Sequence, residues 1–388
     1  MTARSSSRKF GWCVDLVSDN APEESEFRVA AESMVGHTGR LVTDHQIDSE
    51  GRGTSFRAGD LLFSKLRPYL AKSWVANRDG EALGDIHVYR PVDGMCSRYL
   101  GYLVLSSFFL EQVNASTYGT KMPRANWDFI KTIEVWVPDF DTQRRIADYL
   151  DRETATIDAL IDKQTAHVGL LRERRLAAQN RAVMGLDLDS DLIDGEQVPV
   201  GWTSGPIKRV LESLDSRRVP LNADERGARQ GSFPYYGASG VIDSVDDYLF
   251  DGDLVLVGED GANLLNRSTP LAFVAYGQYW VNNHAHVLRP KFGPVEFWAA
   301  RIEALDVSPV VSGSAQPKLT ADALMALRIS WPENPDDMAR IVEVMTRETA
   351  KIDALISKAE RFIELAQERR AALITAAVTG QIEIPTED

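Results

Sequence analysis

The sequence has few cysteines and no long apolar run. Cys13 and Cys96 are its two cysteines among 388 residues, too few for a disulfide framework or a cysteine-rich zinc site. No apolar stretch approaches the length of a membrane span, and the one that follows Lys9 is interrupted by Asp15, which argues against a signal peptide. We therefore expect a cytoplasmic protein with no membrane segment.

Positive charge is also scarce, because 57 acidic side chains outnumber 43 basic ones and give a formal net charge of −14. Residues 1–140 carry 16 basic and 18 acidic side chains, and residues 188–335 carry 12 and 20. A chain with this balance has to gather its positive charge on one face to bind nucleic acid, or a partner has to supply part of the electrostatic field.

Several catalytic signatures are missing. The sequence has no Gly-Lys pair for a P-loop, no Gly-x-Ser-x-Gly elbow, and no Asn/Asp-Pro-Pro-Tyr/Phe tetrapeptide of adenine methylases. Its six histidines lack the neighbours of a metal cluster. His284 and His286 alternate along an expected strand, which predicts that they face the same side, without a third ligand. We therefore expect no catalytic site, no cofactor and no metal in this chain.

One stretch of the sequence occurs twice. Residues 152–161 return as residues 347–356 with a single difference, at an offset of 347 − 152 = 195. The same offset carries the Glu-Arg-Arg run of residues 173–175 onto residues 368–370. A register held over this distance indicates one structural unit used twice. Charged runs of this kind usually lie on the solvated face of a helix.

Each copy has the pattern of a long amphipathic helix. Apolar residues recur in steps of three, four and seven, which places them on one face. Pro138 and Pro332 precede the two copies, and Gly185 and Gly380 follow them, as start and stop signals. The apolar positions of the first copy include Ile157, Leu160, Ile161, Val168 and Leu171, and those of the second include Ile352, Leu355, Ile356 and Ile363.

A helix of about forty residues rises roughly 60 Å, and its narrow apolar stripe requires a partner helix. The simplest partner is the other copy, so we expect the two helices to form a coiled coil within the chain. The alternative is two unrelated amphipathic helices, each on its own domain.

The segments between the helices have the pattern of two α+β domains. The predicted strands are residues 60–64, 72–76, 86–90 and 133–137 in the first domain, and 253–257, 271–275 and 285–289 in the second. Residues 99–113 and 297–305 are predicted to be helical. The predicted division is 1–138 for domain 1, 139–186 for helix 1, 187–332 for domain 2 and 333–388 for helix 2. The tryptophans expected in the cores are Trp12, Trp74, Trp127, Trp136, Trp202, Trp280, Trp298 and Trp331.

Six segments of the chain carry a family resemblance. They are residues 143–146, which read Gln-Arg-Arg-Ile, and residues 63–70, 235–240, 257–261, 282–287 and 368–382. With these motifs, two α+β domains each followed by a near-identical long helix resemble the specificity subunit (HsdS) of a type I restriction–modification system. The resemblance covers essentially the whole chain.

The resemblance implies a non-catalytic DNA-recognition subunit. Each target-recognition domain would read one half of a bipartite, asymmetric sequence in double-stranded DNA. The helices, packed as an antiparallel coiled coil with a pseudo-two-fold axis, would set the spacing of the two half-sites. They would also dock two methyltransferase subunits (HsdM), which hold S-adenosylmethionine, while motor–nuclease subunits (HsdR) complete the restriction complex. The Glu-Arg-Arg runs would also be available to the methyltransferase.

Candidate DNA-binding residues lie in loops of both domains. Cations and amides in such loops can reach phosphates or the edges of guanine and adenine, and a carboxylate can accept a hydrogen bond from cytosine. The candidates in domain 1 are Lys65, Arg67, Lys72, Tyr118, Gly119, Thr120, Lys121 and Arg124. Those in domain 2 are Tyr236, Ser239, Glu259, Asp260, Asn283, Ser312, Ser314, Gln316 and Lys318. The alternatives are that the cations keep the surface soluble and that the other residues hold the loops in shape.

A second function remains open at this point. The chain can also be a coiled-coil scaffold whose globular ends bind proteins rather than DNA, and its acidic balance favours that alternative. The dependence of binding on salt distinguishes the two, because affinity for duplex DNA falls steeply with salt concentration where phosphates are contacted.

Overall fold

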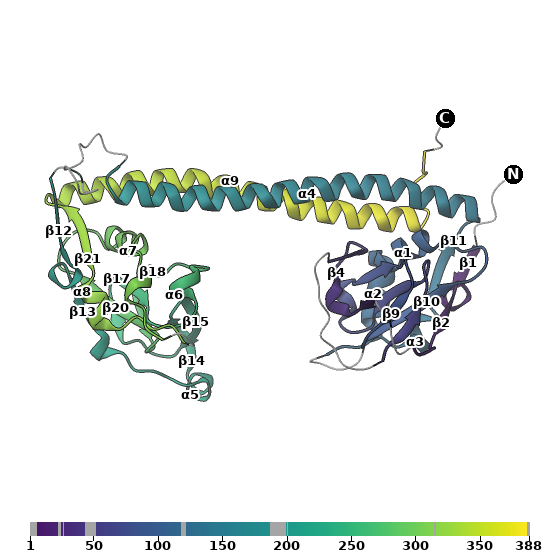
Figure 1. Ribbon diagram of the computed structural model, residues 1–388, viewed down its shortest axis with the longest axis horizontal. Coiled ribbons are helices and arrows are strands. Elements are labelled where there is room, and N and C mark those ends of the chain that lie inside the picture. Colours follow the sequence, from purple (N-terminus) through teal and green to yellow (C-terminus); the bar gives the residue numbers. More distant parts are fainter. Residues whose placement is uncertain are drawn as a thin grey trace. The chain divides into compact units, whose positions relative to one another are not determined.

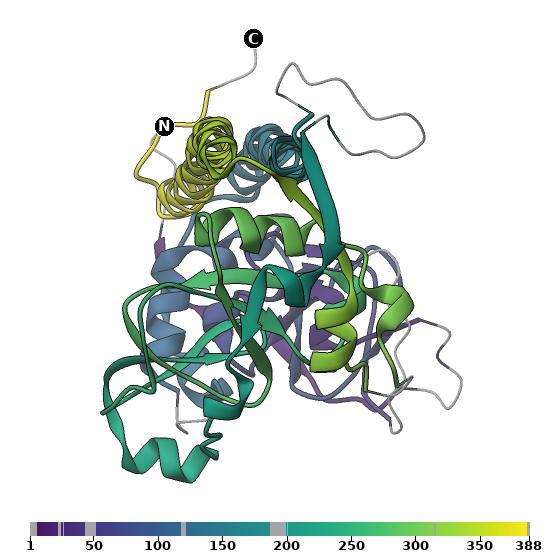
Figure 2. The ribbon, with the colours of Figure 1, turned by 90° about the vertical axis from the view of Figure 1, so that its left-hand side faces the viewer.

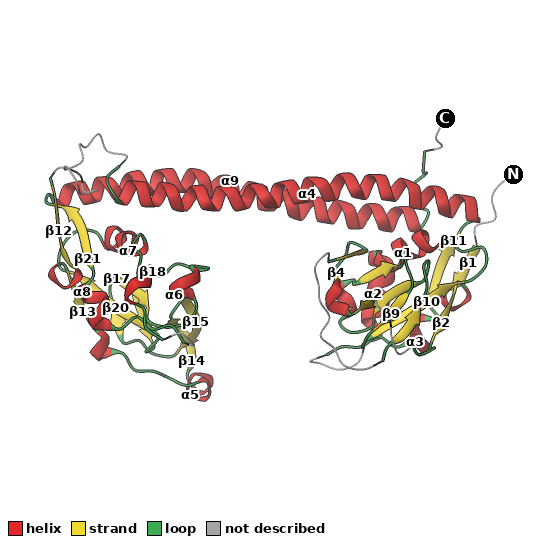
Figure 3. Ribbon diagram, in the orientation of Figure 1, coloured by secondary structure: helices red, strands yellow, loops and turns green. Residues whose placement is uncertain are grey.

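The computed structural model describes residues 6–21, 25, 27–42, 52–117, 122–186, 199, 201–313 and 316–385. The chain folds as two compact units (Figures 1 and 3). Unit 1 comprises Met1–Ala166 and Ala359–Asp388, and unit 2 comprises His167–Lys358. Each unit contains one α+β domain and part of both long helices. The predicted division at residues 138, 186 and 332 stays a prediction, since the two units meet within the long helices.

The two long helices are α4 (Phe140–Val183) and α9 (Pro335–Val378), each of 44 residues. Asp139 caps the start of α4 by accepting a hydrogen bond from the backbone nitrogen of Thr142 at 2.9 Å. Both helices end in the same motif, with Gly185 and Gly380 in the left-handed conformation at φ of 73° and 72°. The backbone bonds of this motif repeat at the 195-residue offset, running from Leu186 to Arg181 and from Gln381 to Ala376.

Within each unit, α4 and α9 pack against each other in antiparallel directions. In unit 1 the Nε of Arg370 donates to Asp158 at 2.8 Å, and in unit 2 the Nε of Arg175 donates to Asp353 at 2.6 Å. Between these contacts the α4 number rises by 175 − 158 = 17 while the α9 number falls by 370 − 353 = 17. The last arginine of each Glu-Arg-Arg run therefore contacts the other helix. The expected solvated position was wrong for Arg370, which is buried, whereas Arg175 is partly exposed.

The predicted apolar stripe is buried in part. Ile157, Val168, Leu171 and Ile352 are buried, and Ile161, Ile356 and Ile363 are half-buried. Leu160 and its counterpart Leu355 are exposed by 45% and 48%. They stand on the border of the stripe, where three- and four-residue steps do not decide between the buried and the exposed face.

The domain of unit 1 is built on an antiparallel four-stranded sheet in the order β2-β10-β7-β8. The helices α1 and α2 pack against this sheet, and α1 also contacts α9, since the Tyr99 hydroxyl donates to the carbonyl oxygen of Val378 at 3.1 Å. The same hydroxyl lies 2.6 Å from the carbonyl oxygen of Trp136. The sheet strands are β2 (Val14–Val17), β7 (Leu61–Ser64), β8 (Ser73–Val75) and β10 (Ile86–Pro91). The other strands are β1 (Ser6–Lys9), β3 (Arg28–Val29), β4 (Met34–Val35), β5 (Arg40–Leu41), β6 (Thr54–Phe56), β9 (Gly80–Ala82) and β11 (Glu134–Val137).

The predicted helix over residues 99–113 is two helices, α1 (Ser97–Leu105) and α2 (Ser107–Ala115). Ser106 separates them because its backbone is extended and its hydroxyl caps α2 by accepting a hydrogen bond from the Phe109 nitrogen. A short helix α3 (Trp127–Ile130) follows. One predicted core residue of this domain was wrong, because Trp12 is 66% exposed.

The domain of unit 2, which faces the viewer in Figure 2, repeats this frame. Its sheet has the order β13-β20-β17-β18. Helix α7 packs on the sheet and shares a core with the start of α9, where Trp298, Met338 and Ile341 are buried. The sheet strands are β13 (Leu211–Ser213), β17 (Leu254–Gly258), β18 (Ala272–Ala275) and β20 (Ala285–Pro290). The helices are α5 (Ala223–Ala228), α6 (Asn263–Asn266), α7 (Val295–Glu303) and α8 (Ala321–Ala326).

Unit 2 also contains a second four-stranded sheet, in the order β15-β14-β19-β16, that the sequence patterns did not predict. Its strands are β14 (Gln230–Gly237), β15 (Gly240–Val245), β16 (Phe250–Asp251) and β19 (Gln278–Val281). A further pair, β12 (Trp202–Pro206) and β21 (Arg328–Pro332), adjoins the long helices, and the β1–β11 pair does so in unit 1. Among the described residues, none of the helices is both long and apolar enough to span a bilayer.

Candidate nucleic-acid interface

In unit 1 the chain beyond β7 pairs with the end of the predicted recognition loop. The backbone nitrogen of Ala125 donates to the carbonyl oxygen of Lys65, and that of Arg67 donates to Pro123, both at 2.8 Å. These bonds bring Lys65, Arg67 and Arg124 together at one corner of the domain, which we call corner 1. Four further candidates, Tyr118, Gly119, Thr120 and Lys121, lie outside the described residues.

Corner 1 has more cationic than anionic side chains. A guanidinium nitrogen of Arg124 lies 2.9 Å from a carboxylate oxygen of Asp85, and the ammonium of Lys65 lies 3.6 Å from the other oxygen. Arg67 is exposed and holds a left-handed backbone at φ of 49°, which is uncommon for a residue other than glycine. The corner can therefore present positive charge and hydrogen-bond donors to an anionic ligand.

Lys72, the remaining candidate of domain 1, does not belong to corner 1. Its ammonium donates to the carbonyl oxygen of Ala31 at 2.8 Å, so it ties two segments of the domain together. Its contact with a phosphate stays a prediction, and the bond that it makes favours a structural role.

Unit 2 repeats the same backbone arrangement 194 residues further on. The nitrogen of Leu319 donates to the carbonyl oxygen of Glu259 at 2.8 Å, and that of Gly261 donates to Pro317 at 3.0 Å. Glu259 therefore stands where Lys65 stands in unit 1 (259 − 65 = 194), and Lys318 stands where Arg124 stands (318 − 124 = 194). Gly261, at φ of 99°, takes the place of Arg67. We call this end of unit 2 corner 2.

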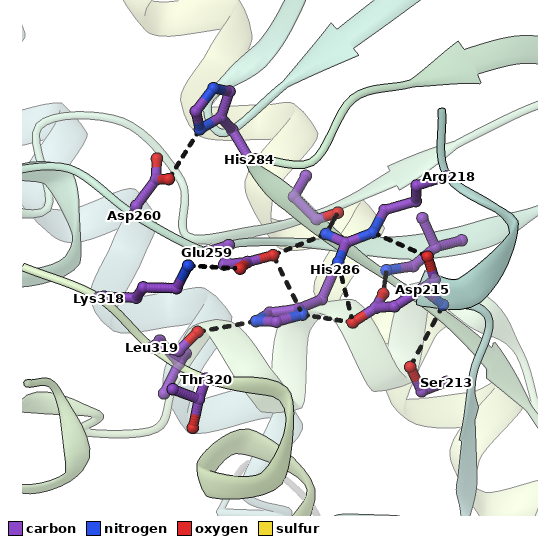
Figure 4. A network of polar contacts seen from close by, with 12 residues as sticks. Ser213, Asp215, Arg218, Glu259, Asp260, His284, His286, Lys318, Leu319 and Thr320 are labelled. Carbon is purple, nitrogen blue, oxygen red and sulfur yellow. Dashed lines mark hydrogen bonds and ion pairs between the residues drawn. The ribbon is translucent and has the colours of Figure 1, made fainter. Parts of the chain in front are cut away.

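Glu259 is enclosed in a network of charged side chains (Figure 4). One carboxylate oxygen accepts a hydrogen bond from Arg218 at 2.7 Å, and the other lies 3.1 Å from the ammonium of Lys318. Burial by itself would raise the pKa of Glu259, but the bond from Arg218 and the nearby positive charges hold this pKa below its usual value. Glu259 is 9% exposed and both of its carboxylate oxygens have a partner, which favours the alternative role of holding the loops in shape. Its contact with a cytosine stays a prediction.

His286 connects the same network to the recognition loop (Figure 4). Its Nδ1 lies 2.6 Å from Oδ2 of Asp215, and its Nε2 lies 2.9 Å from the carbonyl oxygen of Leu319. Burial would raise the pKa of Asp215, yet the hydrogen bonds from His286 and from the Val287 nitrogen hold it below its usual value. Because a carbonyl oxygen can only accept, Nε2 is the donor to Leu319, and the ring bridges Asp215 and the recognition loop.

The alternation along the sequence predicted that His284 and His286 face the same side, and this prediction was wrong. His284 precedes β20 and is exposed, with its Nδ1 at 2.7 Å from Asp260, whereas His286 lies in the strand and is 1% exposed. The two-residue rule holds only inside a regular strand, and β20 begins at Ala285. Within the described part of the chain, no group of three or more His, Cys, Asp and Glu side chains is arranged to hold a metal.

The exposed part of corner 2 contains several of the candidates. Asp260 and Lys318 form an isolated β-bridge, and Ser312 exchanges backbone hydrogen bonds with Lys318 at 2.9 and 2.7 Å. Asn283 and Gln316 are exposed nearby in the sequence segments that meet here. These residues offer carboxylate, amide, hydroxyl and ammonium groups for hydrogen bonds to base edges. Ser314 lies outside the described residues.

Two other candidates belong to the β14–β15 hairpin. Tyr236 packs its ring on Phe273, with centroids 6.0 Å apart, and its carbonyl oxygen accepts a hydrogen bond from Asn282 at 3.0 Å. Ser239 is exposed in the turn of the hairpin. Tyr236 thus positions the segment that leads to Asn283, while Ser239 is free to meet a ligand.

Sequence reasoning missed Asp85, which pairs with the cations of corner 1, and Asp215 and Arg218, which belong to the network of corner 2. Asp215 begins a short 3₁₀ turn after β13 and Arg218 directly follows that turn, in an Asp-x-x-Arg pattern that also occurs in many ordinary turns. Their role follows only from the fold, which brings β13 beside β20.

Two domains with one backbone frame, each built on an antiparallel helix pair and ending in a corner with its own charges, define a modular recognition protein. The chain belongs to a known family: the model of the type I restriction modification DNA specificity domain matches residues 74–168 and 199–363.

Individual relatives agree with this assignment. Over 164 residues the chain is 30% identical to S.HindORF215P of Haemophilus influenzae, described as a type I restriction enzyme specificity subunit, covering 41% of this chain and 40% of the relative. It is 26% identical over 148 residues to the EcoDI specificity subunit of Escherichia coli, covering 36% and 33%. The matched segments thus span less than half of either relative.

One solved structure extends the likeness to nearly the whole chain. A chain from a structure on complex assembly and conformational transition of the type I R-M system superposes with a TM-score of 0.68. The superposition covers 98% of this chain and 99% of that chain at 17% identity. At this level of identity the likeness concerns the fold, in which α+β domains are combined with long paired helices.

Proposed function

We propose that this protein is the DNA sequence-recognition subunit of a type I restriction–modification complex. Each domain reads one half of a bipartite, asymmetric target in double-stranded DNA. The observation that carries the proposal is the pair of corners, which share one backbone arrangement but present different side chains. Two unlike reading surfaces on one frame are what an asymmetric target requires. The predicted pseudo-two-fold relation of the two domains belongs to this proposal.

The two corners suit different base contacts. Lys65, Arg67 and Arg124 of corner 1 provide donors for phosphates or for the O6 and N7 acceptors of guanine. Asp260 and Gln316 of corner 2 provide groups that can accept from an exocyclic amino group or pair with adenine. The base contacts of these and the other candidate residues remain predictions.

The long helices support the proposed partners. Leu170 and Leu365 are exposed, as are Leu160 and Leu355, and the members of each pair differ by 195 residues (365 − 170 = 195). Exposed leucines at repeated positions suit apolar contacts with helices of another protein. We assign these surfaces to two methyltransferase subunits (HsdM), with motor–nuclease subunits (HsdR) completing the assembly.

The chemistry belongs to the partners in this proposal. The methyltransferase subunits hold S-adenosylmethionine, and this chain contributes recognition without a catalytic site or a cofactor. The partners also supply positive field, which a chain with a net charge of −14 needs for tight DNA binding. We place the complex in the cytoplasm, whose reducing conditions suit the free, buried thiols of Cys13 and Cys96.

One purification and titration tests both parts of the proposal. The chain is co-expressed with methyltransferase subunits, and the complex is titrated with duplex DNA over a range of salt concentrations. We expect co-purification, and a steep fall of log affinity with log salt, by about 0.9 for each phosphate neutralised.

The matched control for the helix surface is Thr156→Lys, because the second copy already has Lys351 at the equivalent position. Leu160→Lys combined with Leu355→Lys should abolish co-purification, whereas Thr156→Lys should not. A complex whose DNA affinity is independent of salt would favour the protein-binding scaffold. Unchanged co-purification of the leucine variant would contradict the assigned docking surface.

A further inference from the structure

We infer that Asp215 and His286 are positioning residues that set the sequence specificity of domain 2 by fixing residues 316–318 against the chain that follows β17. The inference rests on the proposed function, because it assigns these residues a role in DNA recognition. Neither residue has to touch DNA. They act through the loop that carries Gln316 and Lys318.

The end of the loop is held by two hydrogen bonds, one to the backbone nitrogen and one to the carbonyl oxygen of Leu319. The backbone nitrogen of Leu319 donates to the carbonyl oxygen of Glu259 at 2.8 Å, at the end of β17. The carbonyl oxygen of Leu319 accepts a hydrogen bond from Nε2 of His286 at 2.9 Å. The peptide groups that follow Lys318 are therefore fixed by β17 on one side and by His286 on the other.

His286 is itself fixed by Asp215. One carboxylate oxygen of Asp215 accepts from Nδ1 of His286 at 2.6 Å, and the other accepts from the backbone nitrogen of Val287 at 2.8 Å. The imidazole is buried between this carboxylate and the Leu319 carbonyl, so the contacts at its two ring nitrogens fix the orientation of its plane. Asp215 thereby determines the direction in which His286 meets the loop.

The surrounding charges make this arrangement cooperative. Arg218 lies 2.7 Å from Glu259 and 3.5 Å from Asp215, and His286 lies 3.7 Å from Glu259. Glu259 in turn holds the ammonium of Lys318 at 3.1 Å. Removing one member of a buried network leaves its partner charged and uncompensated, so the remaining groups rearrange together. Rearrangement here moves the backbone and the side chain of Lys318, and with them the reading surface.

Unit 1 offers a comparison inside the same protein. His87 occupies the position of His286, since His87 pairs with Phe63 of β7 as His286 pairs with Val257 of β17. Its Nδ1, however, lies 2.9 Å from the hydroxyl of Tyr89, and corner 1 is held by Arg124 and Asp85 instead. Changes at Asp215 and His286 should therefore affect only the half-site that domain 2 reads.

The test uses the assembled methyltransferase complex with full-length variants of this chain. The methylated motif is mapped first with the natural chain, and the half read by domain 2 is identified by exchange of residues 1–138. Variants Asp215→Asn, His286→Gln and His286→Leu are then compared with His87→Gln as the matched control. For each, methylation rates are measured on DNA with the cognate sequence and with single-base changes in either half.

We expect His286→Leu and Asp215→Asn to lower discrimination in the domain 2 half by about tenfold, roughly the value of one base contact, and to leave the other half unchanged. His286→Gln, which keeps a donor for the Leu319 carbonyl, should recover part of the loss. His87→Gln should leave the domain 2 half unchanged.

Three results would overturn the inference. One is natural discrimination in a folded His286→Leu variant. Another is an equal loss in both halves. The third is a loss that tracks a lowered melting temperature and is the same for His286→Gln and His286→Leu, since this would mark a purely structural role. Failure of the proposed function is distinct, because the natural complex would then show no methylated motif at all.

Discussion

The two corners share their backbone and differ in charge. Lys65 in unit 1 corresponds to Glu259 in unit 2. The backbone nitrogen of Lys65 donates to the carbonyl oxygen of Asp85, and that of Glu259 donates to the carbonyl oxygen of His284. From unit 1 to unit 2, the first position therefore changes from a basic to an acidic residue, and the second changes from an aspartate to a histidine. A constant backbone arrangement holds each loop, while the side chains on it decide what the loop can bind.

The histidines at equivalent positions follow this reversal. Burial and the positive charge of Lys65 lower the pKa of His87 to about 4, so it is neutral at physiological pH. His286 faces the carboxylates of Asp215 and Glu259 instead. The same residue type at the same strand position is therefore a neutral, half-buried group in one domain, and in the other it links a carboxylate to the recognition loop.

The helix pair shows a second difference between the units. Arg370 and Arg175 are equivalent by the repeat, and each binds the aspartate of the other helix. Arg370 is only 6% exposed, and it also donates to the carbonyl oxygens of His37 and Thr38 in the domain. Arg175 is partly exposed and has Gln179 of its own helix as a further contact. Arg370 therefore links the helix pair to the domain of unit 1.

The largest expected effect comes from removing this contact. Arg370→Ala leaves two carbonyl groups without this donor and leaves Asp158 with the exposed Arg40, 3.1 Å away, so we expect a loss of about 3 kcal/mol in the free energy of unfolding. Urea denaturation at pH 7 measures this loss.

Arg175→Ala is the matched control at the equivalent position. Because the Arg175–Asp353 pair is partly exposed, its loss should cost less than about 1 kcal/mol. Equal losses for the two variants would show that the domain contact of Arg370 contributes nothing, and would remove this distinction between the units.

A smaller effect is expected from the titration of His87. Its folded pKa of about 4 is below the unfolded value of 6.5, so the unfolded state binds more protons between these values. Stability should therefore fall as the pH is lowered from about 6.5 to about 4, by about 2 kcal/mol after allowance for partial exposure.

His87→Gln isolates this term, because glutamine does not titrate. The free energy of unfolding of the natural protein, measured by urea denaturation between pH 7 and pH 4.5, should fall more steeply than that of the variant. Parallel pH profiles would mean that His87 does not have the lowered pKa.

The repeated helices and the strands of the main sheets were accessible to sequence reasoning, because they depend on local periodicity and on an exact repeat. Gly185 and Gly380 end the helices as predicted, since a left-handed residue is needed there and glycine adopts it readily. The corners were located through their loops. The pairing within corner 2 was not predicted, because Asp215 and Arg218 are distant in sequence from Glu259 and meet it only through the sheet.

Other errors have equally physical causes. Trp12 is exposed although most tryptophan side chains are largely buried. The residue type alone does not show whether a particular side chain faces the core or the solvent. Leu160 and Leu355 are apolar at helix-pair spacing, yet they remain exposed at the edge of the stripe. The spacing of apolar residues does not distinguish a leucine that packs within the chain from one that is exposed to a partner protein.

The central claim is that two unlike domains on one frame read two halves of one DNA sequence. The most direct measurement replaces residues 1–138 by the first domain of another family member and maps methylated adenines genome-wide in cells that contain the complete complex. The account predicts a bipartite motif in which one half changes and the other half stays as it was. A change in both halves, or a motif that does not respond to the exchange, would contradict it.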